Sequence, residues 1–241
     1  NNLFKFILNK NRYDQLIFYD YESLKNSVKK IGFSIRSHVL NNTVSNERVG
    51  NNKKIIERSF IINIGTLNDR KENLQLIRAF NAILHKIPKE IKLIFVGDGP
   101  EKERIINLIN KLNIKSRVLV KKGTFKNSKI NRYYSKSIAS VSFNQAGLSI
   151  LQSFANSVPF VTKANAISGG EINNILHGYN GFLIGDSISE LEKILIYIIF
   201  QLNLKRTLPG RRNTVHLALY EDVVYTNFVF AYSDQRLSFS Y

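Results

Sequence analysis

The feature that constrains the fold most is a regular alternation of short apolar runs with longer amphipathic segments between residues 60 and 200. The apolar runs predict strands at 60–64, 91–96, 118–120, 138–143, 158–161 and 182–184. The segments between them predict helices at 73–85, 101–112 and 127–137, one from Leu148, a short one ending at 176, and one at 187–200. Strands that alternate with helices of this length pair in parallel, because each crossover covers one face of the sheet. The prediction is an α/β fold with a doubly wound, Rossmann-like parallel sheet.

Polar and glycine-bearing loops follow several of the predicted strands, at 65–71, 97–99, 123–124 and 144–147. In an open parallel sheet, ligands bind off the carboxyl ends of the strands where the strand order reverses. We therefore expect 65–71 and 144–152 to form one crevice. The Gly97-Asp98-Gly99 turn is not a dinucleotide fingerprint, because the third glycine is missing and a proline follows.

Candidate ligand-binding residues come from both of these segments. Gly147 lies between a buried strand and a helix start, where unpaired N–H groups and the helix dipole suit a phosphate. Arg70 and Lys71 are cations suited to a diphosphate, and Gln152 carries an amide on the same helix as the phosphate site. Each has a structural alternative: Gly147 serves only the turn, Gln152 is a surface amide, and the two cations are a solvated pair at a helix start. The helix itself is expected to bury Leu148, Leu151, Phe154 and Ala155 and to leave Ser149, Gln152, Ser153 and Asn156 on its polar side.

The ends of the chain differ from this regular part. Residues 1–44 predict a helix end at 3–8, strands at 15–19 and 35–40, and a helix at 21–31. A polar stretch from 41 onwards predicts a linker, placed at 45–59. Residues 60–204 form the main domain. In the segment 205–241 lysine is absent after Lys205, and the segment is either an exposed tail or out-of-frame sequence.

Composition limits the partners and the compartment. The 241 residues include no cysteine, which excludes disulfides and thiolate metal sites and is typical of a cytoplasmic protein. They also include no methionine, even at position 1, so we expect the sequence to begin inside a longer reading frame. The formal net charge of +17 favours polyanions such as nucleic acid, an anionic membrane face or a phosphorylated substrate. The alternative is a lysine-rich proteome, since the lysines are scattered along the sequence.

Five motifs in order along residues 60–200 carry a family resemblance. They are Gly65 to Lys71 with Leu76-Ile77-Arg78-Ala79-Phe80, then Leu93 to Pro100, Gly147 to Gln152, Val158 to Val161, and Asn180 to Ile184. This part resembles the C-terminal, nucleotide-sugar-binding half of glycosyltransferase family 4 (glycosyl transferases group 1), which has the GT-B fold. Residues 13–42 resemble the last part of the family's N-terminal domain, and this resemblance assigns residues 1–44 to the remnant of that domain.

The resemblance implies retaining transfer of a sugar from a nucleotide diphosphate sugar to a glycan or lipid-linked acceptor in surface polysaccharide synthesis. In the family a lysine at the place of Lys71 neutralises the donor diphosphate. Thr66 stands where the family has an arginine, and Asn144 and Gln152 stand where it has two glutamates that contact the donor sugar and the ribose. Gln145, Leu148 and Glu171 complete the expected donor site, although Glu171 also suits a helix start.

The resemblance implies neither a metal nor a cofactor, and it places the acceptor site and the catalytic residues in the N-terminal domain. We expect this chain alone to bind the donor without completing transfer. A peripheral contact with the inner face of an anionic membrane is a further expectation. The alternatives are a binding relative that has lost catalysis, because Thr66, Asn144 and Gln152 all lack the family's charge, and a basic nucleic-acid-binding domain. No nucleic-acid partner is predicted, because no platform of interleaved aromatic and basic residues is present.

Overall fold

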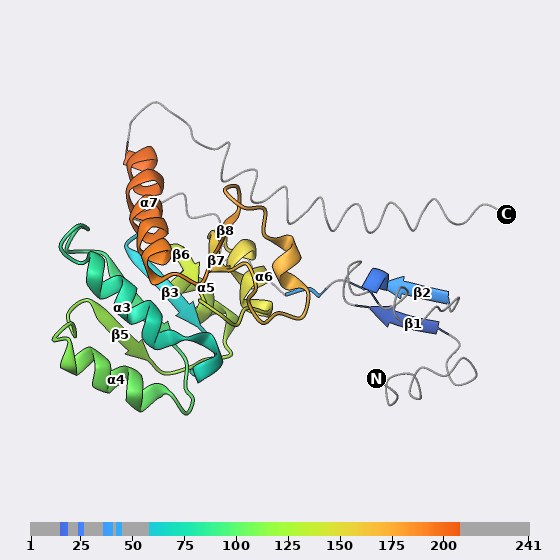
Figure 1. Ribbon diagram of the computed structural model, residues 1–241, viewed down its shortest axis with the longest axis horizontal. Helices are drawn as coiled ribbons and strands as arrows, with labels where there is room; N and C mark the ends of the chain where they lie inside the picture. The colour runs from blue at the N-terminus through green and yellow to red at the C-terminus, as the bar shows by residue number, and fades with distance from the viewer. Residues whose placement is uncertain (1–14, 19–23, 27–35, 41, 45–57, 208–241) are drawn as a thin grey trace.

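The computed structural model describes residues 15–18, 24–26, 36–40, 42–44 and 58–207. Residues 58–207 form a parallel sheet between two layers of helices (Figure 1). Its strands are β3 (Phe60–Ile64), β4 (Lys92–Val96), β5 (Val118–Lys121), β6 (Ser137–Val141), β7 (Phe160–Lys163) and β8 (Gly181–Ile184). The helices are α3 (Asn73–Ile83), α4 (Lys102–Lys111), α5 (Asn127–Ser135), α6 (Leu148–Ala155) and α7 (Ile188–Thr207), with 3-10 helices η1 (Asp69–Lys71) and η2 (Glu171–Asn174).

The sheet has the strand order β5-β4-β3-β6-β7-β8, and every neighbouring pair is parallel. The chain builds outward from β3 through β4 to β5, then returns to the other side of β3 and continues through β6 to β8. The direction therefore reverses between β3 and β6. The prediction of a doubly wound α/β sheet is confirmed, and its switch point lies between the two loops that carry the candidate residues.

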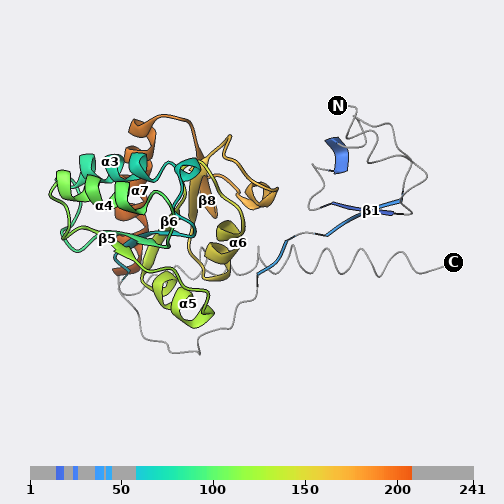
Figure 2. The ribbon, with the colours of Figure 1, turned by 90° about the horizontal axis from the view of Figure 1, so that it is seen from below.

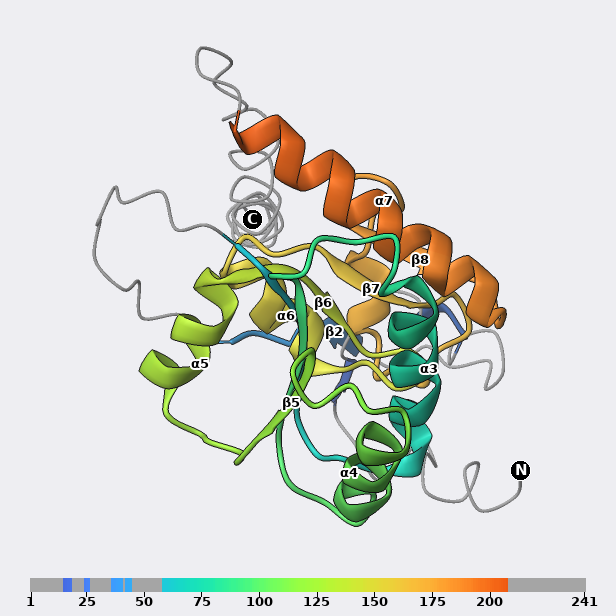
Figure 3. The ribbon, with the colours of Figure 1, turned by 90° about the vertical axis from the view of Figure 1, so that its left-hand side faces the viewer.

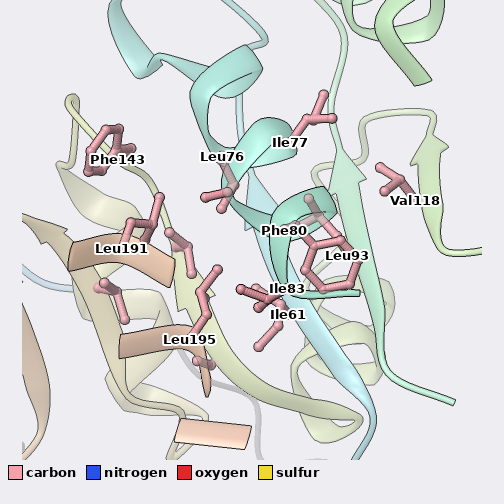
Figure 4. Packing of buried hydrophobic residues seen from close by; sticks show 14 of the residues in the cluster. Ile61, Leu76, Ile77, Phe80, Ile83, Leu93, Val118, Phe143, Leu191 and Leu195 are labelled. Carbon is pink, nitrogen blue, oxygen red and sulfur yellow. The ribbon is translucent and has the colours of Figure 1, made fainter. Parts of the chain in front are cut away.

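Alternating strand residues separate the core into two layers. Ile61 and Leu93 belong to the cluster that α3, α4 and α7 cover, and Figure 4 shows this packing around Phe80 and Leu195. Ile62, the next residue along β3, belongs instead to the cluster beneath α5. Figures 2 and 3 show α3 and α4 on the opposite side of the sheet from α5. This alternation follows from the two-residue period of a strand, because successive side chains lie on opposite faces.

The predicted burial of α6 is confirmed for Phe154 and wrong for Leu148 and Ser153. Leu148 is half exposed, whereas Ile150 is fully buried and packs with Phe154 and Phe160. Ser153, expected on the polar side, is also fully buried, and its hydroxyl donates to the Val158 carbonyl at 2.7 Å. Apolar residues occur on adjacent faces of this helix, so periodicity alone left two rotations open. Contact with β7 and η2 selects the rotation that buries Ile150 and leaves Leu148 beside the loops.

The described segments before residue 58 contain β1 (Gln15–Phe18) and β2 (Arg36–Val39), which pair in parallel with Gln15 opposite Arg36. Both predicted strands at 15–19 and 35–40 are therefore confirmed. Residues 24–26 are helical, within the helix predicted at 21–31, and the rest of that helix lies outside the described residues. The helix end at 3–8, most of the linker and most of the tail also lie outside them. Residues 205–207 continue α7, which extends beyond its predicted end at 200.

Candidate functional site

A crevice of about 510 Å³ lies at the carboxyl edge of the sheet, at the switch point between β3 and β6. This volume is in the usual range for a small-molecule site. Four loops contribute its walls, namely those after β3, β5, β6 and β7. The lining residues are Ile64, Gly65, Thr66, Asn68, Lys71, Thr124, Phe125, Ile130, Gln145, Ala146, Gly147, Leu148, Ser149, Gln152, Ile167, Ser168, Gly169 and Glu171.

The loop after β3 buries a lysine against its own backbone. Gly65 has φ +128°, and a Cβ there would lie 2.7 Å from the Lys71 Nζ, so this position requires glycine. Lys71 is only 8% exposed, and its Nζ donates to the Ile64 carbonyl at 3.3 Å. Among the described residues, no carboxylate forms an ion pair with it. Burial lowers the pKa of Lys71, because a desolvated ammonium is disfavoured. The crevice thus contains a buried cationic group that forms no ion pair with the described residues.

The start of α6 forms the facing wall. Gly147 is the N-cap residue, and no side chain caps this end of the helix. Within the described part of the chain, no protein group accepts from the N–H of Leu148 or Ser149. A Cβ at Gly147 would come no closer than 3.9 Å to another residue, at Glu171 Oε2, so the space above the helix end is open. Unpaired N–H groups of this kind, together with the positive end of the helix dipole, bind anions.

Glu171 supplies the negative group of the crevice. It starts η2 and is only 7% exposed. Its Oε2 accepts from the Gly169 N–H at 3.1 Å and from the Ser168 hydroxyl at 3.3 Å, and its Oε1 accepts from the Asn42 amide at 2.8 Å. Glu171 therefore closes the 168–171 turn and also lines the crevice. The bond from Asn42 also brings the segment after β2 to this edge of the sheet.

Most of the predicted donor-site residues line this one crevice, namely Thr66, Lys71, Gln145, Gly147, Leu148, Gln152 and Glu171. Arg70 and Asn144 do not. Arg70 is exposed, and its carbonyl accepts from the Asn144 side-chain amide at 3.1 Å. Asn144 thus ties the β3 loop to the β6 loop across the switch point, and its amide N–H group is used within the protein.

Sequence reasoning did not single out several of the lining residues. Asn68 lies in the predicted loop, but its Oδ1 is buried without a partner among the described residues, and no local sequence pattern indicates this burial. Ser168 and Gly169 lie in the same turn as Glu171, which was the one residue predicted from it. Phe125 follows the predicted polar turn at 123–124 and is fully exposed at the edge of the crevice. An aromatic residue in such a polar loop was the available signal.

A second buried lysine contacts the residue that follows Lys71 and, unlike Lys71, forms ion pairs with carboxylates. Lys163, at the end of β7, contacts Glu72 at 2.8 Å and Asp186 at 3.1 Å, and its Nζ lies 4.5 Å from the centre of the Phe143 ring. Burial disfavours its charge, but the hydrogen bonds with the two carboxylates outweigh burial and raise the pKa of Lys163. We refer to Glu72, Lys163 and Asp186 as the ion cluster.

Two further findings concern metals and membranes. The described residues contain no group of three or more His, Cys, Asp or Glu side chains that could hold a metal ion. None of the helices in the described segments has both the length and the apolar character needed to cross a membrane.

Comparison with known proteins identifies the family. The model of the family described as Glycosyl transferases group 1 matches residues 46–205. The chain belongs to this family. An uncharacterised glycosyltransferase of Methanocaldococcus jannaschii is similar to this member, at 37% identity over 106 residues that cover 43% of the chain and 26% of the relative.

Solved structures share the fold of this Glycosyl transferases group 1 member. An Anabaena protein, HepE, solved in complex with UDP and glucose, has a TM-score of 0.68 at 19% identity, with 98% of this chain and 67% of that one covered. The pneumococcal O-GlcNAc transferase GtfA, in complex with UDP and GlcNAc, has a TM-score of 0.65 at 16% identity, with 97% and 48% covered. The chain therefore spans about a quarter of the archaeal relative and about half of the pneumococcal enzyme.

Proposed function

We propose that the crevice binds a nucleotide diphosphate sugar, with the diphosphate between Lys71 and the start of α6. The observation that carries this proposal is the buried, unpaired ammonium of Lys71, which lines the same crevice as the uncapped helix end at Gly147. A buried charge without a partner is unfavourable, and an anion between these two groups would satisfy both. UDP is present in the structures of the pneumococcal and Anabaena proteins, which supports it as the first donor nucleotide to test.

The remaining lining residues suggest how the donor is oriented. Gln152, one turn along α6 from the helix start, would contact the ribose through its amide. Phe125, fully exposed at the crevice edge, would contact the base. We place the sugar near Glu171, because Asn144 does not line the crevice whereas Glu171 does. Three hydrogen bonds already reach the Glu171 carboxylate, which leaves acceptor capacity for one sugar hydroxyl.

The reaction that fits this site is glycosyl transfer with retention of configuration, to a glycan or lipid-linked acceptor of a surface polysaccharide. In this proposal residues 60–204 are the donor-binding domain, residues 45–59 are the linker, and residues 1–44 belong to the domain that binds the acceptor. The catalytic groups that face the donor would come from that N-terminal domain. The whole protein would act in the cytoplasm, which the absence of cysteine also favours.

A relative that binds the donor without catalysis is the second candidate. Thr66, Asn144 and Gln152 favour it, because each lacks the charge that the resemblance leads us to expect, and the Asn144 amide is used to join two loops. The two candidates differ in turnover. A full-length protein that binds UDP but neither transfers nor hydrolyses any UDP-sugar would support the binding relative.

The test of donor binding is isothermal titration of the chain with UDP, GDP and ADP, and with UMP and uridine as controls. We expect one nucleoside diphosphate to bind at least about tenfold more tightly than its monophosphate, because the second phosphate completes the contact between Lys71 and α6. A monophosphate or nucleoside that binds equally well would refute a diphosphate site. Transfer is tested on the longer protein with the matching nucleotide sugar, with the anomeric configuration of the product read by NMR.

A membrane contact fits one face of α5. Lys126 precedes this helix, and Lys129, Arg132 and Lys136 follow at spacings of three and four residues, so all four exposed cations share one helix face. Residues 104–170 contain eleven lysines and arginines but no aspartate or glutamate. Clusters of this size bind anionic lipid surfaces.

We expect the chain to sediment with vesicles containing phosphatidylglycerol and not with phosphatidylcholine vesicles, and a Lys129→Glu/Arg132→Glu variant to lose this binding. Equal sedimentation of parent and variant would refute the assignment of this face.

A further inference from the structure

Glu72, the residue directly after Lys71, has a backbone conformation that is unusual for its type. Its φ of 53° and ψ of 41° lie in the left-handed region, at the junction between η1 and α3. A residue with a Cβ is strained there, and such a conformation persists only where surrounding contacts hold it. Strained backbone of this kind is concentrated at functional sites. The question is therefore what holds Glu72 and what its conformation serves.

The ion cluster holds the side chain of Glu72 at both oxygens. Lys163 Nζ donates to Glu72 Oε1 at 2.9 Å and to Oε2 at 2.8 Å. The Lys163 side chain is only 8% exposed, and Asp186 and the Phe143 ring contact the same ammonium. Three segments far apart in the sequence, namely the η1–α3 junction, the end of β7 and the loop after β8, thereby meet at one charge.

Hydrogen bonding does little to fix the Lys71 ammonium within its buried position. The Lys71 Nζ has one hydrogen bond among the described residues, to the Ile64 carbonyl at 3.3 Å, near the upper limit of such bonds. Its location therefore depends on the path of the backbone through 71 and 72. A relaxation of Glu72 out of the left-handed region would turn the peptide that joins it to Lys71.

We propose that the ion cluster is a positioning device, in which Lys163 holds Glu72 in the left-handed conformation and so keeps Lys71 in the crevice. Its consequence for ligand binding rests on the proposed donor site, but the positioning of Lys71 does not. Lys163 and Glu72 are positioning residues that act through Lys71 and do not line the crevice.

The test compares two substitutions that both remove the ion pair. Glu72→Gly tolerates φ 53° without strain, whereas Glu72→Ala keeps the strain. The primary measurement is the rate at which an amine-specific acylating reagent modifies Lys71, followed by mass spectrometry, because it needs no ligand. We expect slow modification in the parent and in Glu72→Gly, and modification at least about fivefold faster in Glu72→Ala and Lys163→Met. Adding Glu72→Gly to Lys163→Met should restore slow modification, which a merely structural role for Lys163 would not produce.

The control is Lys102→Met, which removes the exposed ion pair between Lys102 and Asp98 and should leave the Lys71 rate unchanged. Equal rates in Glu72→Ala and Glu72→Gly, or no rescue of Lys163→Met, would overturn the positioning role. UDP affinity is then measured for the same variants, and should be weaker where modification is fast. If the parent binds no nucleotide diphosphate, the proposed function fails while the modification rates still decide the positioning role.

Discussion

Replacement of Lys71 by methionine should change ligand binding and stability in opposite directions. Methionine is similar to lysine in length and lacks the charge, so it fills the same space beside Gly65. Because Lys71 is 8% exposed and has no carboxylate partner in the described chain, its charged ammonium lowers the stability of the ligand-free protein. The same property makes it a strong contact for a bound diphosphate. The two effects can be measured separately in one variant.

The loss of binding can be estimated from the contact. A charge-assisted hydrogen bond contributes about 1.5–3 kcal/mol, so Lys71→Met should weaken nucleotide diphosphate binding roughly ten- to hundredfold. The effect should persist between low and moderate salt, because a partly enclosed pair is screened less than exposed charges. The matched control is Lys115→Met, which removes an exposed lysine just before β5, at the opposite end of the strands from the crevice.

The stability of the ligand-free protein should increase in the same variant. Replacing buried charge with an apolar side chain of similar volume is often stabilising, and we expect the free energy of unfolding to rise by about 1 kcal/mol. Denaturant unfolding with and without UDP measures this. Both expectations fail if Lys71→Met is less stable than the parent and binds UDP as tightly. Lys71 would then not be a cation without an ion pair that binds the diphosphate. Equal losses of affinity in Lys71→Met and Lys115→Met, vanishing with salt, would indicate diffuse attraction by the net charge instead.

Three further predictions concern the same crevice. Gly147→Ala should weaken nucleotide diphosphate binding more than Gln152→Ala. The new Cβ at 147 has no protein neighbour closer than 3.9 Å and only obstructs the ligand, whereas Gln152→Ala removes one ribose hydrogen bond that contributes about 0.5–1.5 kcal/mol. Titration of both variants with UDP decides the order. Asn144→Ala should lower the free energy of unfolding by about 1 kcal/mol and weaken UDP binding severalfold, because the hydrogen bond to the Arg70 carbonyl no longer joins the two loops. Unchanged UDP affinity would show that the two loops stay together without this hydrogen bond. Burial lowers the Lys71 pKa from 10.5, so UDP affinity should fall at a lower alkaline pH than a free lysine would give. The stability of the ligand-free parent should rise over the same pH range, because the unfolded chain keeps the Lys71 proton to higher pH than the folded chain does. Both trends should be absent in Lys71→Met.

The amino-acid sequence by itself determined the architecture and the location of the site. Apolar periodicity is a local property, so the alternating strands and helices could be predicted from short windows, and 60–64 matched β3 at both ends. Parallel pairing then followed from the length of the crossovers, and the switch-point rule brought the loops with Lys71 and Gly147 to one edge. The family motifs selected the same loops, because they are read from residues that are close together in the sequence.

Tertiary structure decided how individual side chains are used. The rotation of α6 depended on what packs against it, and so Ile150 replaced Leu148 in the core. Asn144 bonds to a carbonyl 74 residues away, and Lys163 pairs with Glu72 across 91 residues, distances over which local patterns contain no information. The burial of Lys71 and the exposure of the neighbouring Arg70 also depend on tertiary packing. Desolvation and pairing depend on the groups that the completed fold brings together, and adjacent residues in the chain can therefore have opposite environments.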